Sequence, residues 1–343
     1  MTKILKQVAG IDVAQNELVV SLGRVDQSLC KDIYAYKTFA NKQSGFAALL
    51  VWIKKHTNHE VAVRYVMEAT GVYHEKAAYY LSDLGLEVSI VLPNKISSYM
   101  KTLEIKTITD KTASQAICQF GLERGLDLWQ RPKNIFRDLK QLTRERDQIV
   151  ADRVIAKNQL HAEQAEAFPN DRSIYRANQR IKLLNEQERE IKQEIAQFVK
   201  TDNELHKKIN LITSIPGVGN LTAVIVIAET NGFELIRNKK QLVSFGGLDI
   251  IRKDSGTSVK GKPRISKKGN RHLRKAMHMP ALTAIRNDER FKVIFVRLVS
   301  KHGIKMKAAV AVQRKILEMI YTIWKTEKPY DKEYLQKANT AAA

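Results

Sequence analysis

Heptad-spaced residues in the middle of the chain constrain its fold most. From residue 135 the repeating positions are Leu139, Leu142, Arg146, Ile149, Arg153, Ala156 and Leu160. After an interruption at residues 168–171 the spacing resumes at Ile174, Ala177, Ile181, Leu184, Glu188, Ile191, Ile195 and Phe198. Such a narrow stripe predicts two long helices, forming either an antiparallel hairpin within one chain or an intermolecular coiled coil. We favour the second, an oligomerisation arm, in which the charged positions 146, 153 and 188 weaken the seam and fix its register.

The segment before this arm alternates between strand-like and helix-like stretches. Apolar stretches at 7–13, 18–25 and 32–39 predict three strands with links short enough for an antiparallel meander. Predicted strands at 61–67 and 87–92 then alternate with helices at about 45–55, 74–84 and 110–122. This order predicts an α/β domain with an RNase H-like, or RuvC-like, mixed sheet. The expected organisation is a RuvC-like domain at 1–125, a coiled-coil arm at 126–205, and a mainly helical C-terminal domain at 206–343.

Three carboxylates lie at the ends of these predicted elements. Asp12 interrupts an apolar strand, Glu68 follows another strand, and Asp110 begins a helix. Each has an ordinary explanation by itself, as a turn residue, a loop carboxylate or a helix cap. Together they would bring like charges to one edge of the sheet, and a divalent cation neutralises such a group. No His or Cys cluster competes for a softer metal, so we expect two Mg²⁺ ions and phosphoryl transfer.

The charge balance points to a polyanionic partner. Lys and Arg number 58 against 36 Asp and Glu, which gives a net charge of +22. An excess of this size favours nucleic acid. No apolar stretch reaches the roughly 20 residues of a membrane span, and the first residues lack the apolar core of a signal peptide. Cys30 and Cys118 make neither a disulfide framework nor a zinc site. We therefore expect a cytoplasmic protein with no membrane association.

The excess of positive charge is concentrated in the C-terminal region. Between residues 252 and 275 there are ten basic residues, and Asp254 is the only acidic one. Glycines in the same stretch let the backbone approach phosphates closely. Ile215-Pro216-Gly217-Val218-Gly219 resembles the hairpin of helix-hairpin-helix motifs, whose amides grip a phosphate. The expected nucleic-acid contacts are Lys253, Lys260, Lys262, Arg264, Lys267, Lys268, Asn270, Arg271, Arg274, Gly217 and Gly219.

Ser255 lies within this basic stretch, next to Gly256. A serine in such a place is ordinarily a turn residue or a hydrogen-bond donor to phosphate. The sequence offers no neighbouring base, because Asp254 stands in a cationic field, so activation would require the metal site of the other domain. His272 and His278 are not spaced as metal ligands, and we interpret them as surface or DNA-proximal residues.

In their order along the chain these motifs resemble the DEDD transposases of the IS110 insertion-sequence family, including its IS1111 group, which are bridge-RNA-guided serine recombinases. The resemblance covers nearly the whole chain. The motifs that carry it are Gly10-Ile11-Asp12-Val13, Met67-Glu68-Ala69-Thr70-Gly71, Thr109-Asp110-Lys111-Thr112, Ile215-Pro216-Gly217-Val218-Gly219, Phe245-Gly246-Gly247-Leu248, Ser255-Gly256 and Arg264-Ile265-Ser266-Lys267-Lys268-Gly269-Asn270-Arg271.

The resemblance implies Mg²⁺ at Asp12, Glu68 and Asp110, and a covalent phosphoserine–DNA link formed by Ser255. It also implies donor and target double-stranded DNA, a structured non-coding guide (bridge) RNA, and a tetramer built as a dimer of dimers in the bacterial nucleoid. Position 113, where the family has a fourth carboxylate, is alanine in this chain. Ala113 fits either an engineered inactivating change or a natural variant with weaker metal binding; the otherwise intact motifs favour the first.

Two other functions remain open at this point. A hydrolytic RuvC-like nuclease or junction resolvase would use water in place of Ser255 and would form no protein–DNA adduct. A non-catalytic nucleic-acid-binding protein would agree with the net charge and with Ala113. It would break no strand even if Asp were restored at position 113.

Overall fold

The computed structural model describes residues 3–69, 71–103, 105, 107–234, 236–251, 254, 255, 259–261 and 263–331, with the backbone alone at 254, 255, 259 and 260. Lys253 and Lys262 therefore lie outside the described residues. Contacts divide the chain into two compact units, Met1–Arg131 and Pro132–Ala343. Within the described residues, no helix has the length and apolar character needed to cross a membrane.

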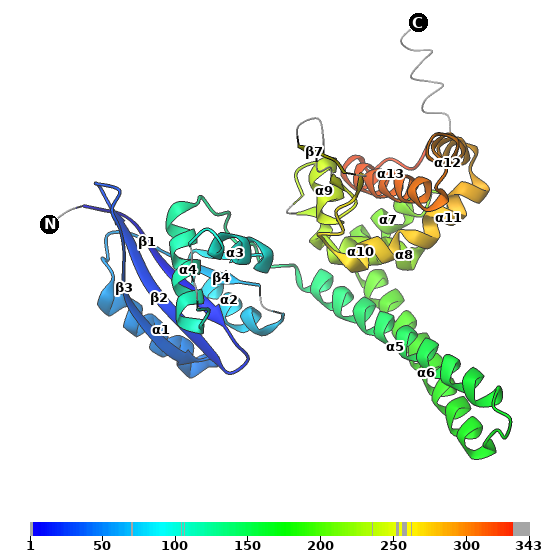
Figure 1. Ribbon diagram of the computed structural model, residues 1–343, viewed down its shortest axis with the longest axis horizontal. Coiled ribbons are helices and arrows are strands. Elements are labelled where there is room, and N and C mark those ends of the chain that lie inside the picture. The colour runs from blue at the N-terminus through cyan, green and yellow to red at the C-terminus, as the bar shows by residue number, and fades with distance from the viewer. Residues whose placement is uncertain are drawn as a thin grey trace, which may run out of the picture. The chain divides into compact units, whose positions relative to one another are not determined.

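The first unit is a mixed sheet with helices on both faces (Figure 1). Its elements are β1 (Ile4–Val13), β2 (Glu17–Asp26), β3 (Lys31–Ala40), α1 (Gln43–His56), β4 (Val63–Glu68), α2 (Tyr73–Asp83), β5 (Val88–Val91), α3 (Pro93–Met100) and α4 (Asp110–Glu123). The strand order is β3-β2-β1-β4-β5. Neighbours among β1, β2 and β3 are antiparallel, while β4 runs parallel to both β1 and β5. This is the RNase H-like sheet that the sequence predicted.

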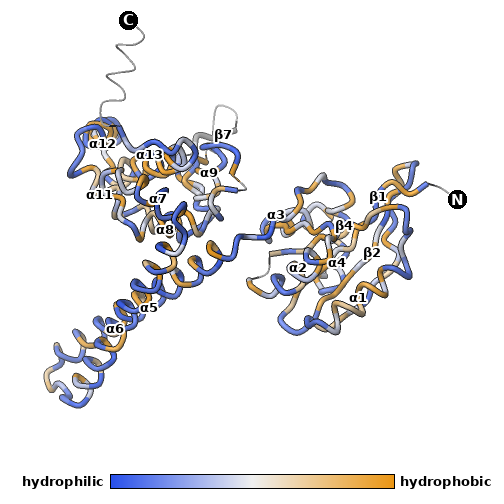
Figure 2. Tube along the Cα trace, turned by 180° about the vertical axis from the view of Figure 1, so that it is seen from behind, coloured by the Kyte–Doolittle hydropathy of each residue, from blue (hydrophilic) through white to orange (hydrophobic). Residues whose placement is uncertain are grey.

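Alternation along β1 decides which side chains face which helices. Ala9, Ile11 and Val13 join the core cluster that contains residues of α1 and α2. Val8 joins the cluster on the opposite face, with residues of α3 and α4. Because successive side chains of a strand point to opposite faces, Gly10 and Asp12 lie on the same face as Val8. Figure 2 shows the hydrophobic character of the central strands. Asp12 is thus directed to the side of the sheet that α4 covers.

Helix α3 was not predicted from the sequence. Pro93 was expected to stop the preceding strand, and β5 does end at Val91, two residues earlier. Pro93 then begins α3 as its first residue. Proline is well tolerated there, because the first helical N–H has no partner within the helix and the ring fixes φ at a helical value.

The second unit consists of a helical arm and a mainly helical globular part (Figure 1). Its elements are α5 (Asn134–Gln164), α6 (Asp171–Thr201), α7 (Asn203–Ile212), α8 (Asn220–Glu229), η1 (Asn231–Phe233), α9 (Lys239–Phe245), β6 (Ile250–Ile251), β7 (Asp254–Ser255), β8 (Val259–Lys260), β9 (Arg264–Ile265), α10 (Arg271–Ala276), α11 (His278–Asn287), α12 (Glu289–His302) and α13 (Lys305–Thr326).

Helices α5 and α6 pack against each other as a hairpin within one chain. Their buried positions include Ile149, Ala156, Ile191 and Ile195, all taken from the predicted stripe. In Figure 2 both arm helices are mainly hydrophilic with short hydrophobic segments at intervals, as a narrow stripe requires. An association between the arms of two chains stays a prediction.

The charged seam positions pair with one another across this hairpin. Glu188 is buried and accepts hydrogen bonds from Arg146 at 2.8 and 3.1 Å and from Arg153. The ammonium of Lys192 lies 2.8 Å from the same carboxylate. The three charges predicted to weaken the seam therefore compensate one another inside it.

The core of the globular part is built around α8. Every residue from Ala223 to Glu229 in this helix is buried. It packs against α5, α7 and α10, and its apolar side chains join a cluster that includes Phe233 and Ile316. A helix that is apolar on all sides belongs in the middle of a domain. The single carboxylate in this buried stretch, that of Glu229, is therefore unusual.

Candidate active site and nucleic-acid interface

Strand register brings Asp12 and Glu68 side by side. β1 and β4 are parallel, with Ile11 opposite Met67. Asp12 and Glu68 each follow one residue later, so they lie at neighbouring strand ends and on the same face of the sheet. Both side chains are partly exposed. The pairing of Ile11 with Met67 is what fixes the relative position of these two carboxylates.

Asp110 reaches this edge because α4 lies directly on β1 and β2. A Cβ on Gly10 would stand 2.2 Å from the backbone nitrogen of Cys118, so only glycine permits this approach. The hydroxyl oxygens of Ser21 and Ser114 are 2.8 Å apart and buried between β2 and α4. The helix begins with a capping box in which Thr109 and Thr112 bond each other's backbone N–H. Asp110 is the first residue after that cap and is exposed.

The three carboxylates influence one another electrostatically. Burial, followed by the negative charges of Asp110 and Glu68, raises the pKa of Asp12 to about 6. Burial also raises the pKa of Glu68. Among the described residues, however, no three His, Cys, Asp or Glu side chains lie close enough together to enclose a metal ion. The carboxylates thus converge on one edge of the sheet without forming a closed ligand shell.

This donor set suits a hard divalent cation. Carboxylate oxygens are the ligands that Mg²⁺ prefers. A cation would neutralise the repulsion from Asp110 and Glu68 that, after burial, raises the pKa of Asp12. Ala113 lies one helical turn after Asp110 and therefore on the same face of α4. It contributes no oxygen there, so the described site offers three carboxylates from β1, β4 and α4.

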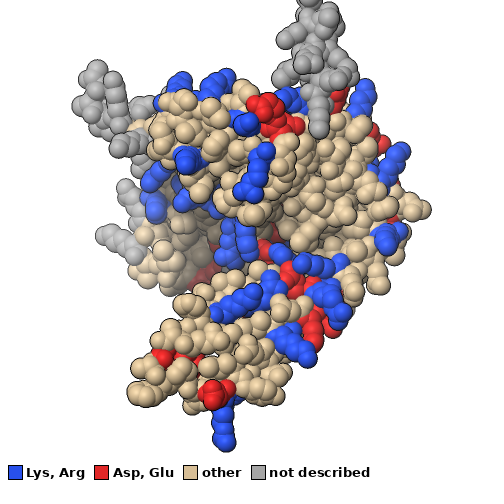
Figure 3. Space-filling view, turned by 90° about the vertical axis from the view of Figure 1, so that its right-hand side faces the viewer, with Lys and Arg blue, Asp and Glu red and all other residues tan. Residues whose placement is uncertain are grey.

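The part of the basic segment that the structure describes is largely exposed. Arg264, Lys267, Lys268, Arg271 and Lys275 are all exposed. Lys and Arg side chains are spread over the face of this unit drawn in Figure 3. Ser255 belongs to the short strand β7, paired with β8, which contains Lys260. The side chains of Ser255 and Lys260 are not described.

Two residues expected to contact nucleic acid make bonds inside the unit. Arg274 donates from Nη1 to the carbonyl oxygens of Gly246 at 2.9 Å and Gly269 at 3.0 Å. The Asn270 side chain accepts hydrogen bonds from the backbone N–H groups of His272 and Leu273, and so caps α10. Both residues hold the basic segment in place in this structure.

The two glycines of the predicted phosphate hairpin differ. Gly217 has a φ of +85°, and a Cβ there would lie 2.5 Å from the carbonyl oxygen of Pro280 in α11. Its glycine identity is therefore explained by packing. Gly219 is exposed, has open space around its Cα, and precedes α8 without a side-chain cap. Of the pair, Gly219 has the more accessible backbone.

The two histidines are also held by neighbours. Nδ1 of His272 lies 3.7 Å from an Asp147 carboxylate oxygen. Nδ1 of His278 lies 3.1 Å from Nε2 of Gln313. Both rings are partly buried, so they are less accessible than the sequence suggested.

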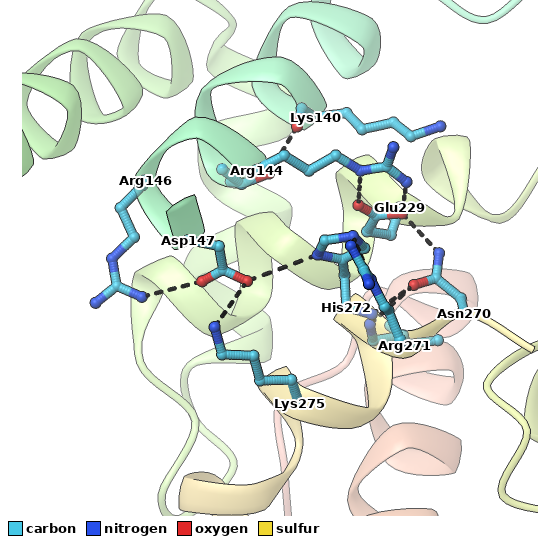
Figure 4. A network of polar contacts seen from close by, with 11 residues as sticks. Lys140, Arg144, Arg146, Asp147, Glu229, Asn270, Arg271, His272 and Lys275 are labelled. Atoms are coloured by element: carbon cyan, nitrogen blue, oxygen red, sulfur yellow. Dashed lines mark hydrogen bonds and ion pairs between the residues drawn. The ribbon is translucent and has the colours of Figure 1, made fainter. Parts of the chain in front are cut away.

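Sequence reasoning missed the ion pair that the buried Glu229 makes with the partly exposed Arg144. It lies at the base of the arm, next to Asn270 (Figure 4). The local signal was a lone carboxylate ending the apolar stretch Leu221–Ala228, since a buried charge needs a partner. Its partner lies 85 positions away in sequence and could not be named without the fold.

Comparisons with known proteins agree with this architecture. The profile of DEDD transposases of the IS110 type matches residues 9–169, and that of the transposase IS116/IS110/IS902 family matches residues 209–295. A pilin gene-inverting protein of Moraxella lacunata is 28% identical over 336 residues, covering 95% of this chain and 98% of that protein. A transposase for insertion sequence element IS1111A from Coxiella burnetii is 23% identical, covering 77% and 78%.

Among solved structures, RuvC from Thermus thermophilus aligns with 36% of this chain and 99% of its own, at 12% identity and a TM-score of 0.28. That likeness is too low to carry an argument. By contrast, the sheet order and the two profiles together define a DNA transposase with a divalent-metal-dependent active site, typically for Mg²⁺. The profiles follow one another along the chain in the order of its two units. The chain belongs to the IS110 family of transposases.

Proposed function

We propose that this chain catalyses RNA-guided DNA strand exchange for an insertion sequence, with Ser255 as nucleophile and Mg²⁺ held by Asp12, Glu68 and Asp110. The observation that carries the proposal is the convergence of the three carboxylates on one edge of an RNase H-like sheet, in a chain of the IS110 family. The exposed basic residues that follow Ser255 along the chain, from Arg264 to Lys275, support it, because their cations suit DNA phosphates. A guide RNA and a tetrameric assembly are part of the proposal only because of the resemblance to the IS110 family.

The proposed chemistry is a transfer of one phosphodiester bond. The Ser255 oxygen bonds to a DNA phosphorus as the bond to one deoxyribose oxygen breaks. The serine loses its proton, and the departing oxygen gains one. The bond energy is kept in a phosphoserine ester, so a second strand's hydroxyl can reverse the step and join to new DNA. A bound Mg²⁺ would neutralise the carboxylates and polarise a phosphate oxygen.

The test is the covalent adduct. The chain is incubated with Mg²⁺, donor and target DNA, and the non-coding RNA of its own element, and the products are separated on denaturing gels. An adduct that is absent from the Ser255→Ala variant supports the proposal. Free cleaved ends that persist in Ser255→Ala would identify a hydrolytic nuclease. Binding without strand breakage, even in Ala113→Asp, would identify a non-catalytic binding protein.

A second candidate is inversion of a DNA segment, favoured by the near full-length match to the pilin gene-inverting proteins. It uses the same strand exchange on two sites in opposite orientation within one molecule. A plasmid that contains such a pair of sites distinguishes the two functions. Inversion flips the intervening segment, whereas transposition moves it to another molecule.

A further inference from the structure

The buried carboxylate of Glu229 joins the arm to the basic segment. Its side chain is 1% exposed and ends helix α8. It accepts two hydrogen bonds from the Arg144 guanidinium of α5, at 2.7 and 3.0 Å. It accepts a third, 2.6 Å long, from the Asn270 side-chain amide nitrogen. Figure 4 shows these three residues meeting from three separate elements.

The bond to Glu229 dictates which way the Asn270 amide faces. A carboxylate can only accept, so it selects the NH₂ end of the amide. The amide oxygen must then point toward α10, where it accepts from the N–H groups of His272 at 2.9 Å and Leu273 at 3.0 Å. The Asn270 backbone N–H also donates to Phe245, at 2.7 Å. The Asn270 side chain thus links the buried Glu229 carboxylate to the first turn of α10.

A second contact holds the same turn to the arm. Asp147 lies one helical turn after Arg144 on α5, and one of its oxygens is 3.3 Å from the Lys275 ammonium. The same oxygen lies 3.7 Å from His272. Helix α5 therefore contacts α10 directly through the Asp147–Lys275 ion pair, and indirectly through Glu229 and Asn270 (Figure 4). The exposed Arg271 and Lys268 border this turn.

We propose that Glu229 is a positioning residue for phosphate binding: through Asn270 it holds the first turn of α10 at the base of the arm and so fixes where Lys268 and Arg271 meet DNA. Only the DNA-binding part of this proposal rests on the proposed function. Burial would raise the pKa of Glu229, but hydrogen bonds from Arg144 and Asn270 outweigh it, so the pKa is lowered and the carboxylate stays ionised at neutral pH.

A structural ion pair and a positioning residue respond differently to one double substitution. Arg144→Met with Glu229→Met keeps the net charge, puts an apolar side chain of similar size at the buried Glu229 position, and leaves no buried charge without its partner. It removes the acceptor that orients Asn270. The matched control is Arg314→Gln with Glu318→Gln, which removes another Arg–Glu pair of the same unit, on α13.

The full chain and its variants are compared by hydrogen exchange without DNA, and by binding to a labelled duplex across a series of KCl concentrations. In the Met/Met variant, exchange at the His272 and Leu273 amides accelerates about tenfold, or about 1.4 kcal/mol. The slope of log affinity against log salt falls by about 2, since two phosphate contacts contribute roughly 0.9 each. The control variant changes neither. Unaltered exchange in the Met/Met variant overturns the proposal.

The Asn270→Ala variant provides a second, independent test. It removes the cap directly at a half-buried position, so folding is retained. If Glu229 acts through Asn270, adding the Met/Met change to Asn270→Ala produces no further acceleration at these amides. Additive effects overturn the proposal. If the unaltered chain binds no duplex, the proposed function fails, whereas the exchange experiment still decides the role of Glu229.

Discussion

Replacing Glu188 with glutamine tests the charged seam of the arm. The Glu188 side chain is 7% exposed and its carboxylate is held by Arg146, Arg153 and Lys192. Burial by itself would raise the pKa of Glu188. The hydrogen bonds from Lys192, Arg146 and Arg153 outweigh it and lower that pKa from 4.5 to about 2. Glutamine has nearly the same shape but no charge, so it leaves Arg146 and Arg153 of α5 without the carboxylate of α6 that compensates their charges.

The contribution of the Glu188 charge to arm stability follows from its shifted pKa. The difference between 4.5 and about 2, at about 1.4 kcal/mol per pKa unit, corresponds to roughly 3 kcal/mol of arm stability near neutral pH. Because the pKa is depressed in the folded state, this stabilisation is complete above about pH 4.5 and is lost as pH falls toward about 2. At about pH 3 roughly 1.4 kcal/mol remains.

The assay is hydrogen exchange of the arm amides in the full chain. Near neutral pH, Glu188→Gln should lower the free energy of arm opening by about 3 kcal/mol relative to the unaltered chain. At about pH 3 the difference should shrink to about half. Glu190→Gln, exposed on the same helix, is the matched control and should change little. Equal protection in the Glu188 and Glu190 variants, or a difference independent of pH, would refute the reasoning.

Three further predictions concern the first unit. Gly10→Ala should destabilise it in urea unfolding by about 3 kcal/mol, because the new Cβ meets the Cys118 backbone; Gly125→Ala, in open space, should not. Asp110→Asn should lower the pKa of Asp12 from about 6, because it removes the second contributor after burial; carboxyl NMR titration measures it. Ala113→Asp should increase Mg²⁺-dependent strand exchange in a plasmid recombination assay with the cognate RNA, and no gain would count against the family's fourth ligand acting here.

The parts of the fold that the sequence predicted are those with a strong local period. Short apolar stretches with short links between them identified β1, β2 and β3, and heptad spacing identified α5 and α6. Helix α3 was missed because Pro93 both ends a strand pattern and begins a helix, and local composition does not separate these roles. The α5–α6 hairpin was one of two stated alternatives, since heptad spacing describes a helix face but does not name the chain that covers it.

For the candidate site, the predicted strand ends indicated which carboxylates lie close together, whereas contacts between residues far apart in sequence could not be predicted. Asp12 and Glu68 could be expected to lie close together from the sequence because Asp12 lies one residue before the end of β1 and Glu68 ends β4. The Arg144–Glu229–Asn270 contacts join residues 85 and 41 positions apart, which no local pattern encodes. Asn270 was expected to contact nucleic acid from its basic surroundings. The structure shows that its side chain caps α10, and a contact with nucleic acid stays a prediction.

The Ala113→Asp experiment is informative because residue 113 does not position α4. The helix is fixed on the sheet by the Gly10–Cys118 approach and by the buried hydroxyl pair of Ser21 and Ser114. Its first turn is fixed by the Thr109 capping box. Ala113 is only partly buried, so an aspartate there adds a carboxylate beside Asp110 without moving the helix. Any change in strand exchange would then result from the added metal-binding carboxylate. The free energy of unfolding of the first unit in urea should change far less than in Gly10→Ala.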